Sequence, residues 1–169
     1  LVDGLNTFIR AWTTSPVTND DGVHVGGITG SLLSIGYAIK NIKPTRVILC
    51  WDGRGGSQRR RKLFPEYKAS RRNKVNLNRS FQGNIDKAAD NQNMKMQLGR
   101  LVQYISNLPI STLAIENIEA DDSIAYVCKQ VLPESQCFIM SSDKDFIQLV
   151  DDRISVWSPT KKKLYFKND

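Results

Sequence analysis

Residues 47–53 read Val47-Ile48-Leu49-Cys50-Trp51-Asp52-Gly53, an apolar run that ends in an acid and a turn-forming glycine. A short continuous apolar run bounded by turn residues is typical of a strand that is buried on both faces. Leu1-Val2-Asp3-Gly4 has the same pattern in a shorter form at the start of the chain. We therefore expect two buried strands, each with an aspartate at its carboxyl end.

The rest of the chain alternates between helical and strand patterns. Apolar residues at spacings of three and four predict helices over residues 28–42, 94–108 and 119–132, with Pro44 and Pro109 ending the first two. Apolar runs predict strands over residues 111–115, 136–140, 154–157 and 164–166, with a short helix around residues 146–150. This order predicts the α/β class, with a mostly parallel central sheet and helices on both faces. Ligands of such sheets bind beyond the carboxyl ends of the strands.

Acidic residues gather where these predicted elements begin or end. The candidate metal ligands are Asp3, Asp52, Glu119, Asp121, Asp122, Asp143 and Asp145. Carboxylates at one sheet edge repel one another, and divalent cations offset that repulsion. Mg²⁺ prefers carboxylate oxygens, and a pair of ions can stabilise both the attacking and the leaving oxygen of a phosphate displacement. The alternative is that the aspartates at helix starts, such as Asp121 and Asp143, only cap those helices.

Residues 53–93 have few apolar side chains and many basic ones, which indicates an insertion or an arch rather than core structure. The candidate nucleic-acid contacts are Arg54, Arg59, Arg60, Arg61, Lys62, Tyr67, Lys68, Arg71, Arg72 and Lys74. Basic side chains neutralise phosphates and aromatic rings stack on unpaired bases, so a single-strand-binding segment is predicted. The alternative is a solvated loop that Phe64 and Tyr67 anchor to the core.

Bulk properties limit the function classes. The 169 residues fit one domain, and the net charge of +7 favours an anionic partner. Three cysteines in apolar runs indicate neither a disulfide framework nor a zinc site, and we expect a cytoplasmic location. The sequence has no apolar run long enough to predict a membrane span. His24 is the single histidine, so catalysis by a histidine base has little support.

Five segments, in order, resemble the signatures of the flap endonuclease and 5′→3′ exonuclease family. They are Val2-Asp3-Gly4-Leu5-Asn6, Trp51-Asp52-Gly53, Phe64-Pro65-Glu66-Tyr67-Lys68-Ala69-Ser70-Arg71, Glu119-Ala120-Asp121-Asp122 and Ser142-Asp143-Lys144-Asp145-Phe146-Ile147-Gln148-Leu149. The nearest likeness is to the bacterial and phage branch, which includes phage ribonuclease H and the 5′-nuclease domain of bacterial DNA polymerase I. The resemblance implies a PIN-like, resolvase-like 5′-nuclease domain over residues 1–169 with a basic helical arch.

The resemblance also implies roles for particular residues. The seven acids named above correspond to the metal site, with Asp122 as an accessory acid, and Lys68 and Arg71 to contacts with the scissile phosphate. The implied cofactor is a pair of Mg²⁺ ions, with Mn²⁺ as a substitute. The implied substrate is DNA with a 5′ single-stranded end or flap, or an RNA–DNA hybrid. We expect a monomer that works beside replication proteins.

The family carries a further pair of metal-site acids in a helix-hairpin-helix region that follows this segment, whereas the sequence ends at Asp169. We therefore expect one metal position to be well formed and the other to be poorly held. Two other functions remain open from the sequence: a small ribonuclease of the toxin type, and a non-catalytic nucleic-acid-binding module whose acids cap helices.

Overall fold

The computed structural model describes residues 1–68 and 86–167. In this part the chain forms two compact units, one of residues 1–6, 44–68 and 110–167, the other of residues 7–43 and 86–109. The first unit contains the whole sheet and every acid predicted for the metal site.

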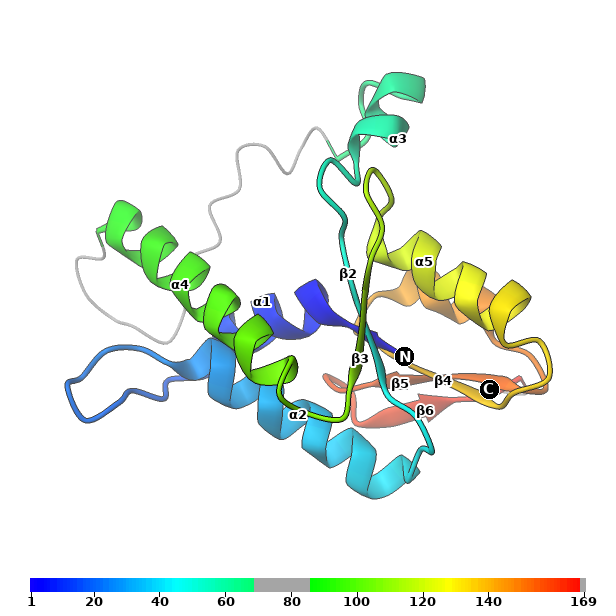
Figure 1. Ribbon diagram of the computed structural model, residues 1–169, viewed down its shortest axis with the longest axis horizontal. Coiled ribbons are helices and arrows are strands. Elements are labelled where there is room, and N and C mark those ends of the chain that lie inside the picture. Colours follow the sequence, from blue (N-terminus) through cyan, green and yellow to red (C-terminus); the bar gives the residue numbers. More distant parts are fainter. Residues whose placement is uncertain (69–85, 168–169) are drawn as a thin grey trace. The chain divides into compact units, whose positions relative to one another are not determined.

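The sheet has six strands in the order β3-β2-β1-β4-β5-β6 (Figure 1). Their bounds are β1 Val2–Asp3, β2 Ile48–Trp51, β3 Ser111–Ala114, β4 Cys137–Met140, β5 Ile154–Ser158 and β6 Lys163–Tyr165. Strands β1 to β5 are parallel to their neighbours, and β6 is antiparallel to β5. The prediction of a mostly parallel sheet is confirmed. Leu49 and Cys50 in β2 are fully buried, as expected of an interior parallel strand.

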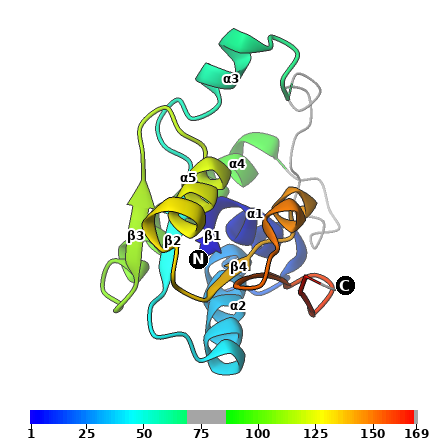
Figure 2. The ribbon, with the colours of Figure 1, turned by 90° about the vertical axis from the view of Figure 1, so that its right-hand side faces the viewer.

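Helical elements of the first unit follow the strand ends. They are α3 Gln58–Leu63, α5 Ala120–Tyr126, the π-helical turn η2 Val127–Val131 and the 3-10 helix η3 Lys144–Leu149. The helix predicted over residues 119–132 is confirmed, although its last turn is π-helical. Helix α5 packs on β1, β2 and β3. Ile124 of α5 and Cys128 of η2 join Ile139 and Val156 in the hydrophobic core. Figures 1 and 2 both show α3 beyond the carboxyl end of β2.

Helices α2 Gly26–Ile42 and α4 Lys87–Ile105 pack on each other in the second unit. Helix α2 ends where Lys43 adopts a left-handed conformation with φ of 51°, just before Pro44, as its sequence pattern predicts. Helix α4 begins at Lys87 rather than near residue 94, so the boundary predicted for the basic segment was wrong. Its start is fixed by Asp86, whose carboxylate accepts a hydrogen bond from the N–H of Ala88.

Helix α1, Gly4–Thr14, was not predicted. Its signal was present, because apolar residues at 5, 8, 9 and 12 have helical spacing and Asp3 accepts a hydrogen bond from the N–H of Asn6. Phe8 and Trp12 are fully buried. The turn expected at Asp3-Gly4 is therefore a direct passage from strand to helix.

Close packing explains why a glycine follows the aspartate in both Asp-Gly pairs. A Cβ atom on Gly4 would lie 2.7 Å from the ring of Trp51, and one on Gly53 would lie 1.7 Å from the carbonyl oxygen of Ile115. Glycine is thus required by the close approach of neighbouring groups at both positions. None of the helices within residues 1–68 and 86–167 has the length and apolar character needed to cross a membrane.

Candidate metal centre and phosphate-binding cleft

Three carboxylates gather at the start of α5, and we call Glu119, Asp121 and Asp122 the α5 acids. Each offers one oxygen, and these oxygens all lie within 4.8 Å of one another. Glu119 occupies the N-cap position and is only 3% exposed, whereas Asp121 and Asp122 lie in the first helical turn. Such a set of oxygens matches what a hard divalent cation prefers.

Asp52 joins the end of β2 to the start of α5. Its Oδ1 accepts a hydrogen bond of 2.7 Å from the backbone N–H of Ala120, which is 68 residues away in sequence. This N–H belongs to the first turn of α5 and has no acceptor within the helix. Asp52 therefore caps α5 from another element, which fixes the α5 acids beside the end of β2.

Asp3, in the central strand β1, has two hydrogen-bond donors. The N–H of Asn6 donates to Oδ1 at 3.2 Å and the hydroxyl of Ser141 donates to Oδ2 at 3.0 Å. Burial raises the pKa of the Asp3 carboxyl to about 6, because its desolvation outweighs these two hydrogen bonds, and repulsion from Asp52 and Asp143 adds to the rise. Asp3 is thus coupled electrostatically to acids on both sides of β1.

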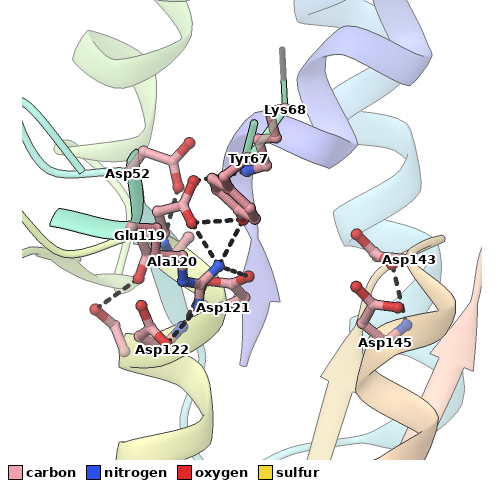
Figure 3. A network of polar contacts seen from close by, with 11 residues as sticks. Asp52, Tyr67, Lys68, Glu119, Ala120, Asp121, Asp122, Asp143 and Asp145 are labelled. Carbon is pink, nitrogen blue, oxygen red and sulfur yellow. Dashed lines mark hydrogen bonds and ion pairs between the residues drawn. The ribbon is translucent and has the colours of Figure 1, made fainter. Parts of the chain in front are cut away.

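Asp143 and Asp145 form a second acidic group beyond β4. Figure 3 shows them on the far side of the N-terminal strand from the α5 acids. Asp143 is the N-cap of η3 and accepts a hydrogen bond of 3.0 Å from the N–H of Asp145. The capping alternative therefore describes part of what Asp143 does, and its role as a metal ligand stays a prediction.

Two basic side chains from the segment after β2 reach into the α5 acids. The guanidinium of Arg60 donates to Glu119 at 2.5 Å, to Asp121 at 3.0 and 3.3 Å, and to Asp122 at 2.5 Å. Lys68 Nζ donates to the other oxygen of Glu119 at 2.6 Å. Burial works against both cations, yet the hydrogen bonds with these carboxylates and Tyr67 raise the pKa of each above its usual value.

Tyr67 ties the two cations together. Its hydroxyl donates to Glu119 Oε2 at 2.9 Å and accepts from Arg60 at 2.7 Å. Its ring centroid lies 5.4 Å from the Arg60 guanidinium carbon and 5.0 Å from Lys68 Nζ, within reach of cation–π attraction. Figure 3 shows Tyr67 and Lys68 facing Glu119.

A cleft of about 420 Å³ adjoins the α5 acids. Its walls include Asp52, Glu119, Arg61 and Lys68, with the glycine-containing loop of residues 53–58. The cleft therefore brings predicted metal ligands and predicted phosphate contacts to one place. Arg54, Arg59 and Lys62 are exposed. Arg71, Arg72 and Lys74 lie outside the described residues, and the roles of all these cations stay predictions.

The neutral residues that hold the acids were not predicted from the sequence. The side-chain oxygen of Asn6 accepts hydrogen bonds from the N–H and the hydroxyl of Ser142, at 3.1 and 2.7 Å. The Ser141 hydroxyl, besides donating to Asp3, accepts from the N–H of Asp143 at 3.1 Å. The available signal was position alone, because Ser141 and Ser142 directly follow β4 and Asn6 follows Asp3 by three residues.

Comparison with known families agrees with this geometry. Residues 1–169 match the family model described as 5′-3′ exonuclease, N-terminal resolvase-like domain. The chain belongs to this family. Membership confirms the resemblance that the five ordered segments indicated.

Two curated relatives show how far the likeness extends. A 5′-3′ exonuclease of Bacillus subtilis (strain 168) is 29% identical over 161 residues, covering 92% of this chain and 49% of the relative. Flap endonuclease Xni of Shewanella denitrificans is 31% identical over 163 residues, covering 96% of this chain and 56% of the relative. The chain spans about half the length of the curated relatives it matches.

Solved structures share the fold of this chain. The T5 D15 protein co-crystallised with metal ions superposes with a TM-score of 0.74 and 25% identity, covering 98% of this chain and 55% of that chain. The bacteriophage T5 D15 flap endonuclease in complex with DNA and metal ions has a TM-score of 0.75 and 23% identity, covering 98% and 56%. These matches confirm the resolvase-like, PIN-like fold class.

Proposed function

We propose that this chain is the catalytic domain of a metal-dependent 5′ nuclease that hydrolyses phosphodiester bonds near 5′ ends or flaps. The observation that carries the proposal is the meeting of two acids, Asp52 and Glu119, with two cations, Arg61 and Lys68, in one cleft. The names of the relatives, 5′-3′ exonuclease and flap endonuclease, support this reaction. The DNA and metal ions in the T5 D15 complex support this substrate and cofactor.

The residues present fit a divalent cation. The α5 acids supply oxygen ligands within 4.8 Å of one another. The guanidinium of Arg60, itself a cation, already binds these oxygens. Asp3 and Asp52 would complete this side of the site, and Asp143 and Asp145 the other. A cation bound there supplies positive charge that activates water and stabilises the charge that develops on the phosphate.

Protein groups would position the substrate. Lys68 lines the cleft, and its ammonium donates a hydrogen bond to the Glu119 carboxylate. When substrate enters the cleft, this ammonium would donate to a phosphate oxygen instead. Charge at this position stabilises the transition state most when the donor is already oriented. The hydroxyl and ring of Tyr67 orient the Lys68 ammonium, so that Tyr67 would act through Lys68 rather than on the substrate.

We also propose the finer assignments: Mg²⁺ as the natural ion with Mn²⁺ as a substitute, two ions per site, and DNA or RNA–DNA with a 5′ single-stranded end as substrate. The net charge of +7 supports an anionic polymer as partner. A monomer acting beside replication proteins in the cytoplasm is the setting that we propose for this activity.

The test is cleavage of a 5′-labelled flap oligonucleotide in Mg²⁺ by the unaltered chain and by Asp143→Asn. We expect the substitution to remove more than nine tenths of the activity and to leave DNA affinity, measured by fluorescence anisotropy, nearly unchanged. Asp152→Asn is the matched control, because the Asp152 side chain is 83% exposed and, within the described residues, its ion pair is with the exposed Lys167. Binding without metal-dependent cleavage by the unaltered chain would instead identify a non-catalytic module.

A further inference from the structure

Arg60 has contacts that differ from those expected of a residue that guides DNA. Its two terminal nitrogens donate to all three α5 acids and to the Tyr67 hydroxyl. The guanidinium thus lies among the same oxygens that the proposed metal site needs. A divalent cation binds carboxylate oxygens at roughly 2.0–2.6 Å, which leaves no room for a guanidinium between them.

We propose that Arg60 is an internal counter-cation that competes with metal for the α5 acids, so that metal entry releases Arg60 and α3 for contact with substrate phosphate. This inference rests on the proposed metal site. Three carboxylates so close together repel one another when no cation is bound, and the Arg60 guanidinium offsets that repulsion within the chain. A bound metal ion takes over this neutralisation, and like charge then disfavours Arg60 among the same oxygens.

The attachment of α3 explains why such a release would move a whole element. Helix α3 has six residues and buries none of its side chains, and the hydrogen bonds of Arg60 tie it to α5. A helix this short has little stability of its own. Loss of the Arg60 contacts should therefore loosen residues 58–63, among them Arg61 in the wall of the cleft.

Competition of this kind has a thermodynamic signature. The apparent affinity for metal is reduced by the fraction of molecules in which Arg60 occupies the α5 acids, and removing Arg60 should restore it. The coupling is reciprocal: if the Arg60 contacts weaken metal binding, then bound metal should weaken the Arg60 contacts that attach α3 to α5.

The first measurement is Mn²⁺ binding to the DNA-free chain by isothermal titration calorimetry, for the unaltered chain, Arg60→Gln and Arg59→Gln. Both substitutions remove one positive charge from α3, but Arg59 is exposed and, within the described residues, is not one of the ion-pair partners of the α5 acids. We expect Arg60→Gln to bind Mn²⁺ at least about fivefold more tightly than Arg59→Gln. Equal affinities, or weaker binding by Arg60→Gln, would overturn the competition.

The second measurement is amide hydrogen exchange over residues 58–63 with and without Mn²⁺. In the unaltered chain and in Arg59→Gln, we expect Mn²⁺ to speed exchange, whereas Arg60→Gln should exchange fast in both conditions. Exchange in α3 that ignores Mn²⁺ in the unaltered chain would also overturn the inference. If the unaltered chain and both variants bind no Mn²⁺ at all, the metal site of the proposed function fails together with the inference, whereas equal binding by all three refutes Arg60 competition alone.

Discussion

At the scale of residues, the site depends on neutral side chains as much as on acids. Ser141 links Asp3 to the backbone of Asp143, so one hydroxyl joins acids from β1 and from the end of β4. The two contacts of Asp3 come from residues 3 and 138 positions away. The acids could be predicted from the sequence because they end strands or begin helices, whereas the role of Ser141 depends on strand order, which sequence pattern does not determine.

Asp3 should make the metal-free chain sensitive to pH. Its folded pKa of about 6 lies above the value near 4 of an unfolded aspartate, so the fold favours its protonated form. Its contribution to the free energy of unfolding is therefore most favourable below about pH 4 and declines as pH rises through 6. In EDTA, Asp3→Asn should be more stable than the unaltered chain at pH 8 by about 1–3 kcal/mol, and this gain should shrink towards pH 4.

Urea unfolding at pH 4, 6 and 8 measures this difference. Mg²⁺ should reverse the order at pH 8, because an ion bound to the ionised carboxylate stabilises only the chain that keeps Asp3. A stability difference that stays constant across this pH range would show that the Asp3 carboxyl has an ordinary pKa in the fold.

At the scale of elements, the passages from strand to helix determine where the acids point. The loop after β2 holds Asp52 in place because Gly53 donates a hydrogen bond to the carbonyl of Ile118 and approaches Ile115 closely. The strands and most helices could be predicted from apolar spacing. Helix α1 and the start of α4 were not predicted, since an Asp-Gly pair and a polar first turn were each interpreted as loop.

Gly53→Ala should destabilise the chain by about 1–3 kcal/mol, because the added methyl group would meet backbone atoms of Ile115 that cannot move aside cheaply. Gly36→Ala is the matched control. Gly36 is exposed in the middle of α2 with nothing within 4 Å of an added Cβ, so this change should stabilise by about 0.5–1 kcal/mol. Chemical denaturation of both variants provides the comparison, and equal effects would contradict the close approach at Gly53.

At the scale of the whole molecule, one sheet edge collects acids from four separate parts of the sequence. Asp3, Asp52, the α5 acids and Asp143 with Asp145 come together because parallel strands place their carboxyl ends on the same side. The sequence predicted acids at the ends of these elements, and their roles as metal ligands stay predictions. It did not predict that the acids would divide into two groups about β1, nor that Arg60 would lie among the α5 acids, because both depend on side-chain placement across elements.

We propose that this edge of the sheet binds divalent metal through the named carboxylates. Crystals of the chain soaked in Mn²⁺ and measured near the manganese absorption edge would locate the ion directly. We predict an anomalous peak within coordination distance of Glu119 and Asp121 on the β2 side of Asp3, with the Arg60 guanidinium displaced from the α5 acids. A fully soaked crystal with no peak at this edge, or with its peak elsewhere, would show that these carboxylates do not hold the metal.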